Sequence, residues 1–197
     1  TDVEKLVFVS TDKAVNPDNV MGATKRLAEL AMTHQAQGSN LAVSMVRFGN
    51  VLGSSGSVVP LFERQIAKGG PVTLTHADVT RYFMTVEEAS ALVLQSATHN
   101  GAPSTASLYV LDMGEPVRIK SLAEAMIRLK GLVPGRDIEI RTTGLRAGEK
   151  MHEMLTYNHE EVHSIGIEGI YKVASKQIVA NDFSEKISEL LDHAQNR

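Results

Sequence analysis

Apolar residues occur along the chain in two patterns, as short continuous runs and at positions three or four residues apart. The runs are rich in Val, Leu, Ile and Phe and predict strands at residues 5–9, 41–48, 72–75, 108–112 and 137–141. The helical spacing predicts helices at residues 19–37, 58–68, 87–98, 121–130 and from 182 onward. Strands that alternate with helices are typical of an α/β fold.

Residues that favour helix ends agree with these boundaries. Pro17 suits the approach to a helix because its missing N–H is not needed there, and Asp18 or Asn19 can cap the free amides of the helix at 19–37. Near the end of the chain, Asp182 and Glu185 have the spacing of a capping box. We therefore expect both helices to begin at capped N-termini.

Two of the predicted helices have one apolar side. For the helix at 19–37, the side expected to be buried consists of Val20, Ala23, Leu27, Leu30 and Ala31. Lys25, Arg26 and Glu29 are expected elsewhere on this helix. The tail helix has an apolar stripe of Ile187, Leu190 and Leu191.

Polar residues follow the first strand and also lie on the next helix. Residues 10–13 stand directly after the apolar run 7–9, where a parallel sheet presents its chemistry. Met21 and Lys25 are four residues apart and therefore project from one face of the helix. These two clusters are predicted to converge on one crevice, although ordinary turn and surface contacts would explain the same residues.

Composition and charge narrow the class of protein. With 197 residues, 43% of them hydrophobic and 22% charged, the chain is a globular domain long enough to bury a core. A net charge of −3 with scattered Lys and Arg gives no footprint for nucleic acid. The lack of cysteine excludes disulfides and thiolate metal sites and suits the cytoplasm. No apolar run approaches the roughly 20 residues of a membrane span, and no signal peptide is visible.

Two motifs resemble the active-site pattern of the extended short-chain dehydrogenases, in which a strand ending in Ser-Thr is followed by Tyr-x-x-x-Lys. Here Ser10-Thr11 is followed by Met21-Gly22-Ala23-Thr24-Lys25. The sequence Ser-Thr-Asp-Lys-Ala-Val-Asn-Pro at 10–17 is similar to the nucleotide-sugar 4,6-dehydratases of bacterial polysaccharide synthesis, often called CapD-like. The resemblance covers almost the whole chain. Most members have Tyr where Met21 stands, and a subgroup of long, membrane-anchored members has Met.

The resemblance also implies how the chain is organised. In the family, the cofactor-binding strands and their glycine turn come before the segment that matches residue 1 onward. The chain has only four residues before its first strand and no Gly-x-Gly-x-x-Gly turn. It is therefore expected to be the C-terminal part of a longer enzyme. Residues 1–75 would complete a doubly wound, Rossmann-like parallel sheet with the catalytic segment, and 76–197 would mainly bind substrate, with some elements returning to the sheet.

The reaction implied by the resemblance is an internal redox elimination. NAD, rather than NADP, takes a hydride from C4 of the sugar, the ketone acidifies the C5 proton, water leaves from C6, and the hydride returns to C6. By position, Asp12 is implied to protonate the departing C6 hydroxyl and Lys13 to be the base at C5. Thr11 is implied to hydrogen-bond near C4. An adjacent acid and base can move protons on two carbons, which agrees with these roles.

The cofactor is implied to lie beside Ser10, Lys25 and Phe48, with Lys25 at its ribose. Met21 occupies a catalytic position, but a thioether is only a weak acceptor and cannot exchange a proton with the C4 hydroxyl. We hypothesise that Thr11, Lys25 or an ordered water relays this proton. A vestigial site is the alternative.

Later motifs are implied to bind the nucleotide sugar. Asn50 and Val51 follow the second strand, and in relatives the matching Asn touches the substrate. Arg81 and Arg146 stand among apolar or glycine neighbours, and a guanidinium matches the oxygens of a diphosphate. Glu149, in the motif Gly-x-Arg-x-Gly-Glu-Lys, is implied to lie near the ribose. A β-turn at Asn50 and solvated surface arginines are the simpler explanations.

One motif points to different chemistry. His159-Glu160-Glu161-Val162-His163 satisfies the His-Glu-x-x-His pattern, in which two histidines on one helical turn bind zinc. It lacks an apolar helical context and an evident third ligand. We therefore expect no metal site.

The sequence is thus interpreted as a lyase that dehydrates UDP-N-acetylglucosamine, or a related UDP-N-acetylhexosamine, to a 4-keto-6-deoxy sugar for capsule or lipopolysaccharide synthesis. A nucleotide-sugar epimerase of the same family is one alternative, and an inactive nucleotide-sugar-binding fragment is another. By resemblance we expect a UDP-sugar as partner, a homo-oligomer, and a cytoplasmic location, with a parent protein anchored to the inner membrane.

Overall fold

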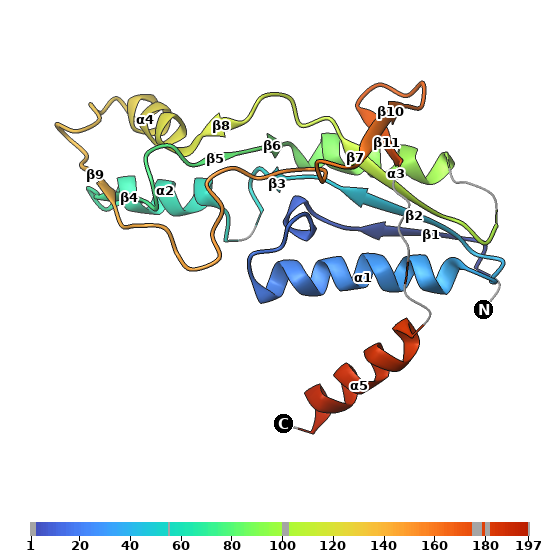
Figure 1. Ribbon diagram of the computed structural model, residues 1–197. Helices are drawn as coiled ribbons and strands as arrows, with labels where there is room; N and C mark the ends of the chain where they lie inside the picture. The colour runs from blue at the N-terminus through green and yellow to red at the C-terminus, as the bar shows by residue number, and fades with distance from the viewer. Residues whose placement is uncertain (1–2, 55, 100–102, 175–178, 180–181, 197) are drawn as a thin grey trace.

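The computed structural model describes residues 3–54, 56–99, 103–174, 179 and 182–196, and its centre is a five-stranded sheet of order β1-β2-β7-β11-β10 (Figure 1). Three neighbouring strands are parallel: β1 (Lys5–Val9), β2 (Ala42–Arg47) and β7 (Ala106–Leu111). β11 (Ile170–Ala174) pairs antiparallel with β7, and β10 (Glu161–Ser164) pairs antiparallel with β11. The parallel strands end at one edge, and this edge holds the candidate site.

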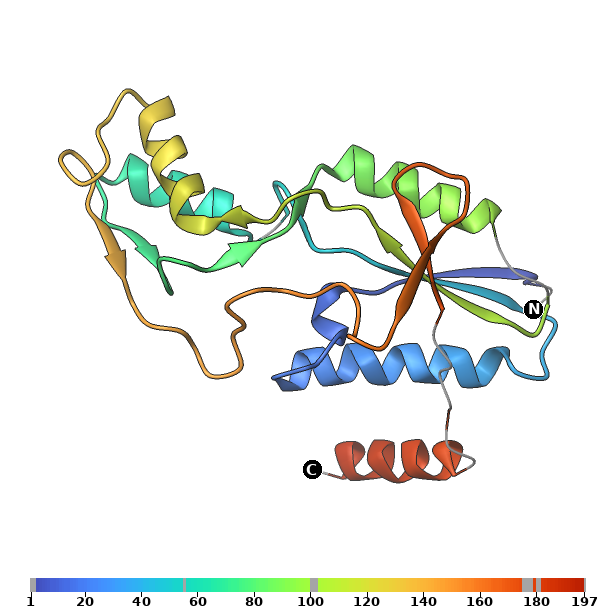
Figure 2. The same ribbon diagram turned by 45° about the horizontal axis from the view of Figure 1, so that its top comes forward.

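Helices cover both faces of this sheet. α1 (Val20–Ala36) lies on one face and α3 (Val86–Thr98) on the other (Figures 1 and 2). Alternate residues of β2 supply the two cores: Val43 and Met45 pack in the cluster that contains Ala36 of α1, and Val46 packs in the cluster that contains Ala89 of α3. This period of two is what a strand buried on both faces requires.

A second region lies beyond the carboxyl ends of the parallel strands (Figure 1). It contains α2 (Val58–Ala67), α4 (Ile119–Leu129) and the parallel pair β4 (Val72–Leu74) and β9 (Ile140–Thr142). Its own core consists of Phe62, Ile66, Val72, Leu74, Val79, Ile119, Ala123, Ile127 and Ile138. This separate core fits a region that folds around its own apolar surface.

Short strand pairs lie between the two regions. β3 (Asn50–Val51) pairs parallel with β6 (Phe83–Met84), and β5 (Thr80–Arg81) pairs antiparallel with β8 (Val117–Arg118). The last helix, α5 (Phe183–Gln195), lies beside α1 (Figures 1 and 2). Among the described residues, no helix combines the length and the apolar character needed to cross a membrane.

The predicted strand and helix order is confirmed, and several boundaries differ. β7 begins at Ala106, two residues before the strand predicted at 108–112, because it pairs with β2 from Val43 onward. β9 begins only at Ile140, because Asp137 instead closes a turn by accepting a hydrogen bond from Val133 N at 2.8 Å. The sequence patterns missed the hairpin of β10 and β11, whose outer strand is exposed throughout.

The capping box predicted for the tail helix is wrong. Asp182 is the N-cap of α5 but makes no side-chain capping bond. Its carboxylate pairs with Lys186 instead, at 2.7 Å. The apolar stripe of this helix is not buried either, because Leu190 and Leu191 remain 54% and 52% exposed.

Of the two caps predicted for the first helix, Asp18 or Asn19, the structure has Asn19, whose side chain accepts a hydrogen bond from Gly22 N at 2.8 Å. The first turn of α1 packs closely against η1 (Asp12–Ala14), a short 3-10 helix after β1. A Cβ atom on Gly22 would lie 2.5 Å from Lys13 O and 3.1 Å from Pro17 Cβ. Only glycine therefore permits this approach of the helix to the segment that carries Lys13.

Glu29 was expected on the exposed part of α1 and is fully buried. Its Oε1 accepts hydrogen bonds from Ser10 Oγ at 2.6 Å and from Arg47 Nε at 2.8 Å. Its Oε2 accepts from Arg47 Nη2 and Arg26 Nη1, both at 2.8 Å. Arg47 Nη1 donates to Glu160 Oε2 at 2.8 Å, so one buried guanidinium joins α1, β2 and the segment before β10.

Burial raises the pKa of Glu29, but hydrogen bonds and charge from Arg47 outweigh it and hold that pKa below its usual value. Burial likewise lowers the pKa of Arg47, and Glu29 and Glu160 more than reverse this. Both partners therefore stay charged in the folded protein. The stability that Glu29 contributes is present above its unfolded pKa and is lost as the pH falls through its folded pKa.

Replacing the buried guanidinium tests this network. Arg47→Met removes the cation shared by two buried carboxylates and leaves Glu29 with Arg26 alone, so we expect the free energy of unfolding to fall by about 3–5 kcal/mol, measured by urea denaturation. The control is Arg141→Met, which removes an exposed arginine that pairs with Glu139 at 2.9 Å and should change stability little. Equal effects of the two variants would contradict a structural role for the network.

Adding one methyl group tests the close approach at Gly22. Gly22→Ala should destabilise the protein by about 1–3 kcal/mol, because α1 and the Lys13 carbonyl must separate. Its matched control is Ala23→Gly in the same turn, where only helix propensity is lost, about 1 kcal/mol. Thermal denaturation measures stability, and the NMR shifts of Lys13 should move in Gly22→Ala alone.

Candidate active site

A cleft of about 1200 Å³ lies between the end of the parallel sheet and the second region. It is lined by residues of η1, the start of α1, β3, α2, β4, β5 and the segment 143–153. Six residues singled out from the sequence lie on its surface: Lys13, Met21, Asn50, Arg81, Arg146 and Glu149. Binding sites of open α/β sheets are found at this position, beyond the carboxyl ends of the strands.

Lys13 and Asn50 line the cleft and belong to a compact polar cluster, whose other members, Thr11 and Asp12, are not among the described residues that line it. Lys13 Nζ donates to Asp12 Oδ1 at 2.7 Å and to Asn50 Oδ1 at 3.3 Å. Thr11 Oγ1 donates to the same Asp12 oxygen at 2.9 Å. Asp12 is fully buried, and its Oδ2 has no hydrogen-bond partner within the described part of the chain. Asn50 is held in place because its Nδ2 donates to Tyr82 O at 3.1 Å.

The opposite wall is the segment 143–153, which is joined to the start of α1. Gly148 has φ +72°, and a Cβ atom there would lie 2.6 Å from Asp18 O. Asn19 Nδ2 donates to Gly148 O at 2.9 Å. Lys150 Nζ donates to Val15 O. The segment is therefore attached at the same turn that leads into the helix bearing Met21.

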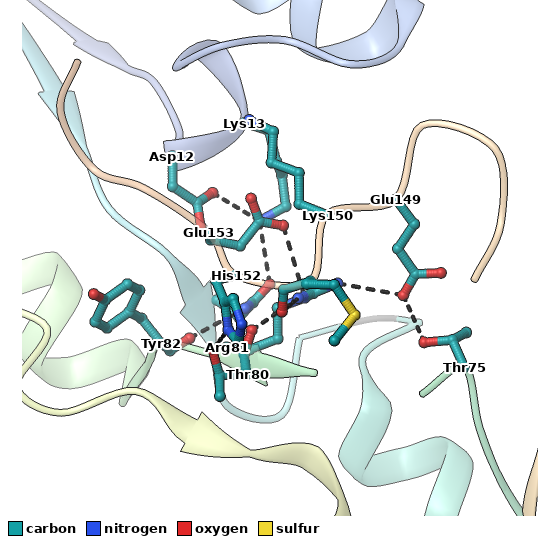
Figure 3. A network of polar contacts seen from close by, with 12 residues as sticks. Asp12, Lys13, Thr75, Thr80, Arg81, Tyr82, Glu149, Lys150, His152 and Glu153 are labelled. Atoms are coloured by element: carbon teal, nitrogen blue, oxygen red, sulfur yellow. Dashed lines mark hydrogen bonds and ion pairs between the residues drawn. The ribbon is translucent and has the colours of Figure 1, made fainter. Parts of the chain in front are cut away.

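Glu149 organises this wall. Its Oε1 accepts from Thr75 Oγ1 at 2.8 Å and from Arg81 Nη2 at 3.3 Å (Figure 3). Its Oε2 accepts from Arg146 N at 3.2 Å. Arg81 also donates to Thr80 O at 2.7 Å and Met151 O at 3.2 Å. The Arg81 guanidinium is thus already hydrogen-bonded to one carboxylate and to two backbone carbonyl groups. The side chain of Arg146 is exposed and lies at the cleft.

Other predicted residues lie away from the cleft surface. The Ser10 hydroxyl donates to Glu29 at 2.6 Å, and Phe48 and Val51 pack against the core cluster on the α3 side of the sheet. Lys25 is exposed on α1, one turn after Met21, and is not among the described residues that line the cleft. The residues implied to bind NAD are Ser10, Lys25 and Phe48. Of these three, Lys25 has an exposed polar group that fits a ribose hydroxyl.

Glu153 is a cleft residue that the sequence did not single out. Its side chain is 6% exposed and its Oε1 lies 3.7 Å from Arg81 Nε. Burial and the charge of Asp12 raise the pKa of Glu153, and the nearby Lys13, Arg81 and Lys150 only partly offset this. No sequence pattern distinguished it from an exposed glutamate, because its environment comes from segments far away in the chain.

The zinc-type motif has no helical geometry. Glu161 to Ser164 form β10, so the two histidines of the motif do not share a helical turn, and Glu160 is the buried partner of Arg47. Within the described ranges, no three His, Cys, Asp or Glu side chains group so as to hold a metal ion.

Sequence comparison identifies relatives of this chain. A family model described as polysaccharide biosynthesis protein matches residues 1–175. The capsular polysaccharide biosynthesis protein CapD of Staphylococcus aureus is 46% identical over 194 residues, which are 98% of this chain and 32% of that protein. A UDP-glucose 4-epimerase of Rickettsia rickettsii is 33% identical over 87% of this chain and 49% of its own length. The chain thus spans about a third to a half of these relatives.

Solved structures share the fold. The X-ray structure of Pen from Bacillus thuringiensis matches with a TM-score of 0.75 and 32% identity, over 89% of this chain and 54% of that one. The NAD complex of dTDP-glucose 4,6-dehydratase from Bacillus anthracis matches with a TM-score of 0.61 and 20% identity, over 77% of this chain and 52% of that one. The chain therefore has an α/β Rossmann-like fold and belongs to the polysaccharide biosynthesis protein family.

Proposed function

We propose that this chain carries the catalytic residues and much of the nucleotide-sugar site of an NAD-dependent 4,6-dehydratase that acts on UDP-N-acetylglucosamine or a related UDP-N-acetylhexosamine. The observation that carries the proposal is the pairing, at 2.7 Å, of Lys13, which lines the cleft, with the buried Asp12 next to it. Dehydration requires an acid and a base at neighbouring carbons of the sugar. An epimerase requires no acid at C6, since no hydroxyl leaves.

The hydrogen bond between Asp12 and Lys13 supports this chemistry through its proton count. An ion pair of carboxylate and ammonium holds the same number of protons as a neutral carboxylic acid beside a neutral amine. Transfer of one proton from Lys13 Nζ to Asp12 therefore creates the acid for the C6 hydroxyl and the base for the C5 proton in one step. The proton arrives at Oδ1, which accepts the hydrogen bond from Lys13, while Oδ2 is buried and without a partner among the described residues.

NAD, when bound, supplies a reversible acceptor for the C4 hydride. In this chain, Lys25 would hold its ribose, and Thr11 would orient the C4 hydroxyl. Thr11 Oγ1 donates to Asp12 Oδ1 at 2.9 Å, which links the C4 side of the site to the acid. Met21, 50% exposed at the cleft, would contact the sugar without exchanging a proton.

The rest of the cleft suits a nucleoside diphosphate. Arg146 brings an exposed guanidinium to it, and guanidinium groups bind phosphate oxygens in a bidentate manner. Ser57, the N-cap of α2, lines the cleft without a side-chain capping bond. A UDP-glucose 4-epimerase is among the relatives of this chain, so epimerisation is the second candidate, and the mass of the product distinguishes the two reactions.

Product analysis tests the dehydratase. The chain is incubated with NAD and UDP-N-acetylglucosamine, and mass spectrometry should show a sugar nucleotide lighter by one water. Lys13→Met should lower the rate about 100-fold or more, because the base is lost. Lys130→Met, an exposed lysine at the end of α4, is the matched control. An isomer of unchanged mass would indicate an epimerase, and no product beside an active full-length relative would mean that this chain alone does not turn over.

Calorimetric titration with UDP tests the substrate side independently of turnover. Arg146→Ala should weaken UDP binding about tenfold or more, because charge-assisted hydrogen bonds to the diphosphate are lost. Arg141→Ala removes an exposed arginine of β9 that is not among the described residues of the cleft, so it should leave the affinity unchanged. Equal losses in both variants would point to a non-specific charge effect and against a diphosphate site at Arg146.

A further inference from the structure

Glu153 lines the cleft close to η1, and no motif assigns it a role. Its side chain is 6% exposed, and its Oε2 is buried without a hydrogen-bond partner among the described residues. The carboxyl group is turned toward Asp12 and Lys13 (Figure 3). Its contact with Arg81 is long, at 3.7 Å, and Glu149 lies nearer to the same guanidinium, at 3.3 Å. Support of Arg81 therefore does not explain why Glu153 is buried here.

Asp12 is likewise a buried carboxyl group with one oxygen that lacks a hydrogen-bond partner among the described residues. It is fully buried, its Oδ1 accepts both hydrogen bonds, from Thr11 and Lys13, and its Oδ2 has no partner among the described residues. Two buried carboxyl groups thus lie near each other, each with one unsatisfied oxygen. Burial makes a bare carboxylate oxygen costly, and neighbouring carboxyl groups in such surroundings resist simultaneous ionisation.

The surrounding charges decide how many protons the pair holds. The charged or titratable groups around Glu153 are Asp12 and Lys13 of η1, Arg81 of β5, and Glu149, Lys150 and His152 of its own segment. Burial and the charge of Asp12 raise the pKa of Glu153 above its usual value, and the three cations only reduce this rise. Asp12 has Lys13 directly on its Oδ1, so the proton is better placed on Glu153.

We propose that Glu153 holds a proton for Asp12, so that the two carboxyl groups share one proton at the wall of the cleft. Glu153 acts through Asp12 and is therefore a positioning residue for the acid. The transfer of this proton to Asp12 during the reaction rests on the proposed function. The sharing of the proton between Asp12 and Glu153 does not depend on which reaction takes place.

Every proton that moves in this step can be accounted for. Asp12 gives the proton that it received from Lys13 to the C6 hydroxyl oxygen, the C–O bond breaks, and water leaves while the neutral Lys13 takes the C5 proton. Lys13 gives this proton back to C5 when the hydride returns to C6, and is then neutral again. Asp12 is then a carboxylate, and the proton on Glu153 passes to it. The C4 hydroxyl releases a proton to water in the cleft, and Glu153 takes up a proton from this water. Asp12 and Glu153 exchange only protons in this step and are neither oxidised nor reduced.

Carboxyl titration by ¹³C NMR on the labelled chain tests the shared proton without NAD or substrate. Glu153 should titrate at higher pH than the exposed Glu115, and its midpoint should move to lower pH in Asp12→Asn, where the neighbouring charge is gone. A Glu153 signal that titrates with Glu115 and ignores Asp12→Asn would overturn the proposal, whatever the reaction proves to be.

The dehydration assay supplies a second readout. Glu153→Gln cannot release a proton, so the rate should fall about tenfold or more, and the loss of activity as the pH rises through the pKa of Glu153 should disappear. Glu153→Asp, which keeps a carboxyl group, should restore part of the rate. Glu115→Gln is the control. A reduced rate with an unchanged pH profile in Glu153→Gln, and no rescue by Glu153→Asp, would assign Glu153 a structural role only and overturn the proposal.

Discussion

The Arg47 guanidinium is fully buried, and the position of several elements depends on the carboxylates that surround it. Glu29 from α1 and Glu160 from the segment before β10 each hold it at 2.8 Å. Removal of any partner would leave a charge in the interior, so these elements are fixed relative to one another. The network also extends to the site: Ser10, next to Thr11, donates to Glu29, and Tyr157, whose N–H donates to Glu160 Oε2, donates through its hydroxyl to Ala14 O.

The cleft contains cationic side chains and carboxyl groups close to one another. Burial and the charge of Asp12 raise the pKa of Glu153, whereas the cations Lys13, Arg81 and Lys150 lower it. Burial prevails, so Glu153 keeps a raised pKa despite three neighbouring cations. Active sites commonly place titratable groups under such opposed influences, because a proton that is held too tightly or too weakly cannot be transferred at neutral pH.

Local sequence signals predicted the features that depend on neighbouring residues. The strand at 5–9, the Asn19 cap and the polar residues after the first strand are set by local propensity and strand-end geometry. Glu29 was misplaced because helical periodicity carries no information about Arg47, 18 residues later. Glu153 was missed for the same reason, since its neighbours come from three separate segments. The tail cap failed because Lys186 competes for the Asp182 carboxylate, as an exposed side chain is free to do.

The contact between Gly148 and Asp18 fixes the span of the cleft. Gly148 lies two residues after Arg146, and Asp18 lies three residues before Met21, so two ends of the cleft, one with Arg146 and one with Met21, are held at a set separation before any ligand enters. Preorganisation of this kind lowers the entropy lost on binding. A molecule that joins its anionic group to its reacting carbons through a shorter or longer linkage would not reach both ends at once. The cleft therefore selects its ligand by length as well as by chemistry.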